Sequence, residues 1–285
     1  MLPKKALIIL LFLFTAAAVF GEIEPSQPFQ RSAILDAETY NSLPRKMFPQ
    51  GRTYEPLAPA VSLRQYAPLP GDQEHYGTCV GWAAAYAAKT IMESVALNRM
   101  NQTETTRNVF SPVYIYRNIQ PDDPGLLRGA QIHRALDLMA ESGAVRMSDA
   151  ERTTASRLID LSHYSASERY PIAGYHTLFS REDRAKPGIV LRAVKRSLAE
   201  ANPVIIAMNT PDSFVEAKGT WTPHESPANF YGGHALCVTG YDDSRNGGAF
   251  EVMNSWGRKW GNGGFMWIPY RAFADFVMEG YEITR

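Results

Sequence analysis

Cys79 has the surroundings that a reactive cysteine needs. It lies in the stretch DQEHYGTCVGWAAAY, directly before an Ala-rich run from Val80 to about Leu97 that we predict to be a buried central helix. The positive end of a helix dipole favours thiolate over thiol, and the thiolate is the nucleophile. Because a lone cysteine is more often a small core residue, this chemistry depends on partners elsewhere in the chain.

Three further residues have the chemistry to complete an acyl-transfer site with Cys79. His234, in YGGHALCVTGYDD, can hold the thiolate as an ion pair, and Asn254, in VMNSWGRKWGNGGFMWIPY, can orient the imidazole ring. Gln73 can donate an N–H to a developing oxyanion, beside the backbone N–H of Cys79. Each residue alone has an ordinary interpretation: core thiol, structural histidine, turn asparagine or surface glutamine. Their occurrence together favours catalysis.

The other charged and titratable residues indicate no second kind of site. The remaining histidines lack the spacing of a metal site, so we expect neither a metal nor a cofactor. Asp242 and Asp243 follow the histidine segment and are alternative groups for orienting the ring, although Asn254 has the better context. With 29 Lys and Arg against 29 Asp and Glu, the chain has no net charge, which argues against nucleic acid or an anionic membrane surface as a partner.

The segments around these residues resemble those of the papain-like cysteine peptidases. The resemblance covers roughly residues 57 to 285 and rests on DQEHYGTCVGWA, GGHALCVTGYDD and NSWGRKWGNGGFMWIP, in that order. It implies hydrolysis of protein or peptide substrates: Cys79 attacks the carbonyl, Gln73 stabilises the oxyanion, His234 transfers the proton and Asn254 holds His234. Another acyl-transfer enzyme, such as an amidase or transpeptidase, and an inactive binding protein of the same fold are the alternatives.

The same resemblance implies residues that contact the substrate. GLLRGAQIHRALDLMAESG resembles the glycine-containing wall of the family's substrate cleft, so Gly129 and Ala130 are expected to present backbone to an extended peptide. Trp256 is expected to shield the asparagine and to border the leaving-group side.

Some positions depart from the family pattern. Tyr76 and Val80 stand where many members have a second cysteine and an aromatic residue, and Trp82 comes three residues after Cys79. The chain is therefore more similar to disulfide-free bacterial members. Its two cysteines could be bridged to each other, but Cys237 lies in an apolar strand-like run, on the face opposite His234. We expect a buried Cys237 and a free Cys79.

The pattern of the chain predicts an α+β fold of two lobes with the active-site cleft between them. A helical lobe is expected from about residue 73 to 185, with helices at 80–97 and at QIHRALDLMAESGAV up to Gly143, and a third helix is expected just after it at VLRAVKRSLAEANP. A strand-rich lobe is expected from about 186 to 285, with strands at PVIIAMN, HALCVTGYDD, GAFEVMNSW and GGFMWIPY.

The N-terminus predicts export. Lys4 and Lys5 precede an apolar run, Ala6 to Phe20, which is typical of a secretory signal over residues 1–21; a single N-terminal anchor helix is the alternative. The mature protein is then periplasmic or secreted and free of the membrane. Residues 22–56 form a short extension before the peptidase-like domain, 57–285. We expect this extension to pack along the domain without filling the cleft, because it is too short for a long inhibitory segment.

Overall fold

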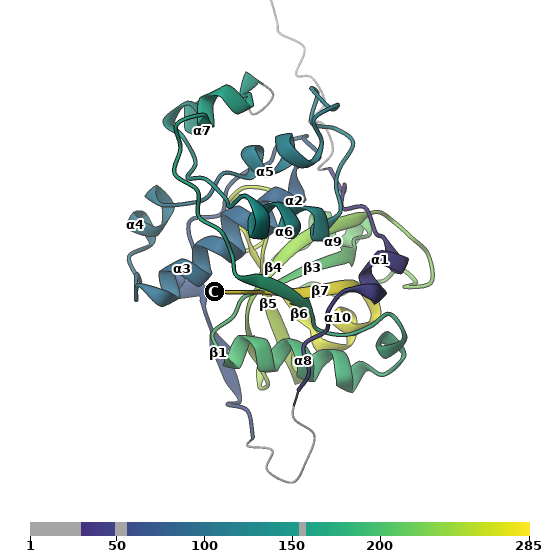
Figure 1. The fold of residues 1–285 in the computed structure, drawn as a ribbon. Helices are drawn as coiled ribbons and strands as arrows, with labels where there is room; N and C mark the ends of the chain where they lie inside the picture. The colour runs from purple at the N-terminus through teal and green to yellow at the C-terminus, as the bar shows by residue number, and fades with distance from the viewer. Residues whose placement is uncertain (1–29, 49–55, 154–157) are drawn as a thin grey trace, which may run out of the picture.

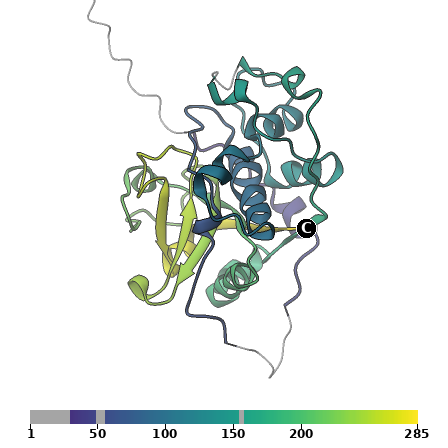
Figure 2. The same ribbon diagram turned by 90° about the vertical axis from the view of Figure 1, so that its left-hand side faces the viewer.

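The computed structural model describes residues 30–48, 56–153 and 158–285. Helices from the first half of the chain lie beside one antiparallel sheet built mainly from the second half (Figures 1 and 2). This confirms the predicted α+β architecture. The predicted signal, residues 1–21, lies outside the described residues, and no helix within those ranges has the length and apolar character to cross a membrane.

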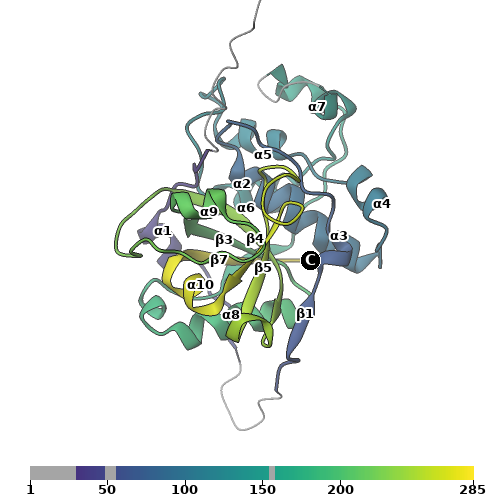
Figure 3. The same ribbon diagram turned by 180° about the vertical axis from the view of Figure 1, so that it is seen from behind.

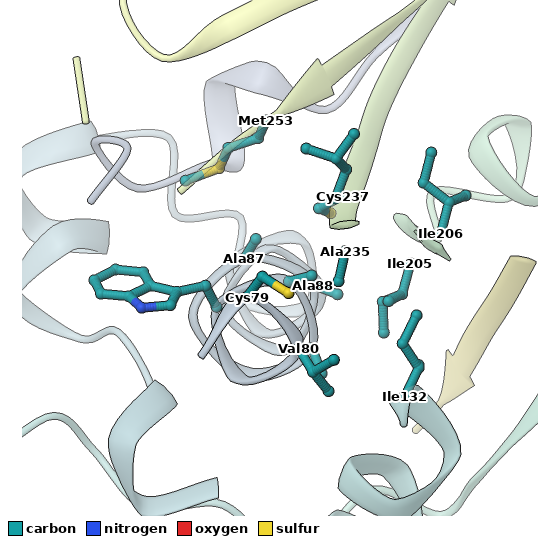
Figure 4. Close-up of a cluster of buried hydrophobic side chains, with 14 of the residues drawn as sticks. Cys79, Val80, Ala87, Ala88, Ile132, Ile205, Ile206, Ala235, Cys237 and Met253 are labelled. Carbon is teal, nitrogen blue, oxygen red and sulfur yellow. The ribbon is translucent and has the colours of Figure 1, made fainter. Parts of the chain in front are cut away.

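The central helix begins at Cys79. Three segments continue without a break: α2 (Cys79–Gly81), the π-helical η2 (Trp82–Lys89) and α3 (Thr90–Ala96). The alanines of η2 are buried, and such small side chains let this part of the helix lie close to β3 and β4. Figure 4 shows Ala87 and Ala88 packed with Ile205, Ile206 and Cys237 of the sheet. The helix is thus fixed on all sides.

Short helices follow this central helix along the chain, and some of them pack against it. They are α4 (Gln102–Arg107), α5 (Pro112–Ile119), α6 (Ile132–Glu141) and α7 (Asp149–Thr153). α5 begins where the Ser111 side chain accepts a hydrogen bond from the N–H of Tyr114 and Pro112 takes the first turn. α6 ends before Gly143, as predicted, because this glycine has a φ of 78°.

The sheet has the strand order β2-β7-β3-β4-β5-β6, and β1 also pairs with β4. Its strands are β1 (Ala60–Ser62), β2 (Gly174–Thr177), β3 (Val204–Asn209), β4 (Gly233–Asp242), β5 (Ala249–Met253), β6 (Phe265–Pro269) and β7 (Val277–Thr284). Every residue of β3 and β5 is buried, since packed elements cover the sheet. α8 (Pro187–Ala199) and α10 (Tyr270–Phe276) pack together beside it (Figure 3). The four strands predicted in the second half are present.

The described part of the N-terminal extension is integrated into the domain. After a cap by Asp36, α1 (Ala37–Ser42) inserts Tyr40, whose hydroxyl donates to the carbonyl of Phe179 at 2.6 Å and accepts from the N–H of Gly280 at 3.0 Å. Lys46 then pairs with the buried carboxylate of Glu282 at 2.7 Å. This anchoring fixes the path of the residues that precede α1.

Candidate active site

Cys79 is the first residue of α2 and is fully buried. Its Sγ lies 3.5 Å from the hydroxyl of Ser32 and also contacts the backbone N–H of Ala235, the residue after His234. Burial raises the pKa of the Cys79 thiol, and these hydrogen bonds offset part of the rise. Both cysteines are free, so the alternative of a bridge to Cys237 is wrong.

His234 and Asn254 are joined directly. Nε2 of His234 lies 2.7 Å from Oδ1 of Asn254, and the same oxygen accepts the N–H of Ser255 at 2.7 Å. Because Oδ1 is an acceptor in both contacts, Nε2 carries the proton and Nδ1 the lone pair. Nδ1 is buried and has no hydrogen-bond partner within residues 30–48, 56–153 and 158–285.

The surroundings of His234 hold its ring neutral. Trp256 stacks on the imidazole, with ring centroids 4.4 Å apart and planes 23° apart. Burial lowers the pKa of His234 from 6.5 to about 4, against the opposite effect of the Asn254 hydrogen bond, and the nearby charge of Arg31 lowers it further. In this structure both residues are buried, and the thiol of Cys79 and the imidazole of His234 are therefore neutral.

Gln73 lies on the loop before α2 and is tied to the asparagine segment. Its Oε1 accepts the hydroxyl of Ser255 at 2.6 Å, and its backbone N–H donates to the Ser255 carbonyl at 2.7 Å. The Nε2 group of Gln73 therefore points away from Ser255. It donates to the carbonyls of Tyr76 at 2.7 Å and of Gln30 at 3.3 Å. A carbonyl from the extension thus occupies the amide that we predicted as an oxyanion donor.

The wall at Gly129 and Ala130 is organised by a buried carboxylate. Asp123 Oδ2 accepts the Tyr116 hydroxyl at 2.6 Å and the N–H groups of Leu127 and Arg128 at 2.7 and 2.8 Å. Burial opposes its ionisation, but these hydrogen bonds prevail and lower the pKa of Asp123. The Tyr116 hydroxyl in turn accepts the N–H of Gly129 at 3.0 Å. The backbone from Leu127 to Gly129 is therefore held in place by buried hydrogen bonds.

Residues 30–34 of the extension lie between Ala130 and β4, over Cys79, where the cleft was expected, so our expectation that the extension leaves it open is wrong. Ala130 donates its N–H to the carbonyl of Ser32 at 3.1 Å and accepts the N–H of Ile34 at 2.9 Å, while Ala33 donates to the carbonyl of Gly233 at 2.8 Å. A Cβ on Gly233 would lie 2.1 Å from the Ala33 carbonyl oxygen. Five residues are enough to cross the cleft, which is why a short extension can cover it.

Sequence reasoning missed three residues of this site. Ser32 contacts the sulfur, Ser255 fixes the amide of Gln73, and Asp123 holds the wall. Only Ser255 had a local signal, because it stands inside the NSWG segment. Asp243 lies elsewhere, bound to Lys195 and the Tyr270 hydroxyl. Within the part of the chain that the structure describes, no group of His, Cys, Asp and Glu could hold a metal ion.

Comparisons with known proteins agree on one family. A model of the papain family of cysteine proteases matches residues 128–279. An uncharacterized peptidase C1-like protein of Acanthamoeba polyphaga mimivirus is 26% identical over 289 residues, covering 92% of this chain and 84% of that protein.

Solved structures of cysteine proteases share the fold. Xylellain from Xylella fastidiosa is 20% identical with a TM-score of 0.65, over 91% of this chain and 96% of that one. Digestive procathepsin L 3 from the larval midgut of Tenebrio molitor is 17% identical with a TM-score of 0.63, over 87% of this chain and 77% of that one.

Proposed function

We propose, because the chain belongs to the papain family of cysteine proteases, that it hydrolyses peptide bonds through an acyl-enzyme formed on Cys79. The observation that carries this proposal is the arrangement of the two facing elements. A thiol at the start of a buried helix contacts the strand that bears an oriented imidazole, and that imidazole has one unoccupied nitrogen. This arrangement supports a base on the strand that contacts the nucleophile.

The role of each group follows from its contacts. Nδ1 of His234 takes the proton of Cys79, because Nε2 is committed to Asn254. The thiolate bonds to the substrate carbonyl carbon, and the oxyanion takes the place that the Gln30 carbonyl now holds at Nε2 of Gln73. His234 then protonates the leaving amine as the C–N bond breaks. Water, deprotonated by His234, attacks the thioester, and hydrolysis releases the acid and restores the thiol.

The described state is a latent one in this proposal. Residues 30–34 cover the sulfur, and burial disfavours both charged partners of the thiolate–imidazolium pair. Residues 30–34 must therefore move off Cys79 before turnover, so the full chain hydrolyses peptides only in the fraction of molecules in which they have moved. Two of the similar solved structures are proforms, the Tenebrio procathepsin and a ragweed pollen cysteine protease. This supports the interpretation of the described state as a latent form of the enzyme. Neither an amidase nor a binding-protein function is favoured by a specific observation.

The test is hydrolysis of a mixed peptide library by the purified protein and by Cys79→Ala. We expect cleavage by the parent and none by the variant, whose urea unfolding curve should nearly match the parent's. Cys237→Ala is the matched control and should retain cleavage, because Cys237 is buried and free. Cleavage by Cys79→Ala would place the nucleophile elsewhere.

The proposal extends to the bounds of the domain and to the export of the protein. Residues 57–285 form the peptidase domain, preceded by the extension 22–56, and residues 1–21 direct export to the periplasm or the medium. N-terminal sequencing of the exported protein should begin near Glu22. An intact Met1 on membrane-bound protein would instead support the anchor alternative.

A further inference from the structure

The extension places a basic side chain beside the active site. Arg31 Nη1 donates to the carbonyl of Thr210 at 2.8 Å and lies 2.9 Å from a carboxylate oxygen of Asp212. The Arg31 side chain is 23% exposed, whereas that of Asp212 is 84% exposed. Gly232 gives the arginine room, since a Cβ there would lie 3.1 Å from Arg31 Cβ. We use the name pocket for the place where Thr210 and Asp212 bind this arginine side chain.

The pocket lies on the His234 side of the sulfur. β3 pairs with β4 so that Met208 is opposite His234, and the N–H of Thr210 then donates to the carbonyl of Gly232. Ser32 lies over the sulfur, and the chain continues from it to the wall at Ala130. Arg31 therefore projects away from the wall, on the side where an imidazole would protonate a leaving amine.

The charge of this region suits a cation. Thr210 offers a carbonyl oxygen and Asp212 a carboxylate, both acceptors. A second carboxylate, Glu225, accepts the N–H and hydroxyl of Ser213 at 3.0 and 2.6 Å. Burial opposes its ionisation, but hydrogen bonds led by those of Ser213 lower the pKa of Glu225. Two negative groups thus flank the same turn.

We infer that Thr210 and Asp212 form a specificity pocket for a basic side chain, arginine above all, at the substrate residue that follows the cleaved bond. This inference rests on the proposed peptidase function. Arginine is favoured over lysine because its guanidinium presents several donors to separate acceptors. Asp212 is the specificity-determining residue, and the extension holds the pocket with an arginine of its own.

The first test uses peptides that differ only in the residue after the cleaved bond: Arg, Ala or Glu. The parent should cleave the Arg peptide with the highest kcat/KM, and Asp212→Asn should reduce the Arg-to-Ala ratio roughly two- to fivefold, the value of a partly exposed ion pair. Glu216→Gln, an exposed carboxylate on the same helix α9 (Asp212–Glu216), should leave the ratio unchanged. An unchanged ratio in Asp212→Asn would overturn the inference.

The second test needs no turnover. Alkylation of Cys79 by iodoacetamide in the full chain reports whether residues 30–34 cover it, and alkylation of the buried Cys237 reports unfolding. Arg31→Glu and Asp212→Lys should each speed Cys79 alkylation roughly two- to fivefold, and the double variant should restore the parent rate. Additive effects in the double variant would contradict a charge-selective pocket.

The two tests separate the inference from the function on which it rests. If the full chain cleaves peptides without preferring Arg, and the double variant shows no coupling, the pocket is wrong and the peptidase stands. If no peptide is cleaved even after residues 22–35 are deleted, but the charge swap restores protection in the full chain, the pocket exists and the peptidase function is wrong.

Discussion

At the scale of single residues, the proposed site rests on four positions whose chemistry the sequence alone indicates. A nucleophile, a base, an orienting amide and an oxyanion donor are each restricted to a few residue types, and Cys79, His234, Asn254 and Gln73 have them. The structure joins His234 to Asn254 and ties Gln73 to the next residue, Ser255. Ser32 was unpredictable, because its importance comes only from a contact with a sulfur 47 positions away.

The lowered pKa of His234 predicts that acid weakens the closed state. With residues 30–34 in place this pKa is about 4, and it should rise toward its ordinary value of 6.5 when they leave and water enters. Between these values the open state binds a proton that the closed state does not. The stability of closure is thus fully present above pH 6.5 and is lost as the pH falls toward 4.

Hydrogen exchange of the Ala33 and Ile34 amides measures this effect, since both are hydrogen-bonded to the cleft. Their protection should fall between pH 6.5 and 4 relative to a His234→Gln variant at the same pH, a comparison that removes the intrinsic pH dependence of exchange. Equal protection profiles in the two proteins would show that His234 does not control closure.

At the scale of elements, patterns of period and capping predicted the helices and strands that bury one clear face. The helix predicted at VLRAVKRSLAEANP is α8, and its apolar residues Val190, Val194 and Leu198 are buried on one face. α5 is harder to predict, because the β-branched and aromatic residues of FSPVYIYRNI are typical of strands and compete with the Ser-Pro start of the helix. β7 lies between β2 and β3 through pairings that span many residues, which no local pattern encodes.

The wall loop yields a prediction about stability. Asp123→Ala should lower the free energy of unfolding by about 2 kcal/mol, because it leaves two backbone N–H groups and the Tyr116 hydroxyl without their buried acceptor. Urea denaturation measures this loss, and KM for peptides should rise as the wall loses its shape. Asp122→Ala, at the exposed neighbouring position, is the control and should change neither quantity. A loss as large in Asp122→Ala would show that the effect is not specific to this network.

At the scale of the whole molecule, segments from the N-terminal part of the chain pack into the structure that the second half forms, and the sequence did not reveal this. β1 comes from the first half and joins the sheet, and residues 30–34 of the N-terminal extension lie over Cys79 before α1 packs against β7. The extension has no sustained period, so its path depends on glycines and carbonyls that meet it in the folded state. Residues 30–34, which cover Cys79, and α1, which anchors the extension through Tyr40, are therefore separate parts of one segment.

This separation predicts different results for two deletions in the mature chain. Deleting residues 22–35 keeps the Asp36 cap and Tyr40, so kcat/KM and the rate of Cys79 alkylation should rise at least about tenfold while the free energy of unfolding changes little. Deleting residues 22–48 also removes the buried ring of Tyr40 and the partner of Glu282, which should cost about 3–5 kcal/mol.

Peptide hydrolysis and urea denaturation of both deletions test this division. The shorter deletion should give an active, stable protein, and the longer one an unstable protein that unfolds at lower urea. Ser42→Ala, which removes only an exposed hydroxyl of α1, is the control for local change. If the shorter deletion were as unstable as the longer one, residues 30–34 would be part of the folding core instead of a cover that can leave it.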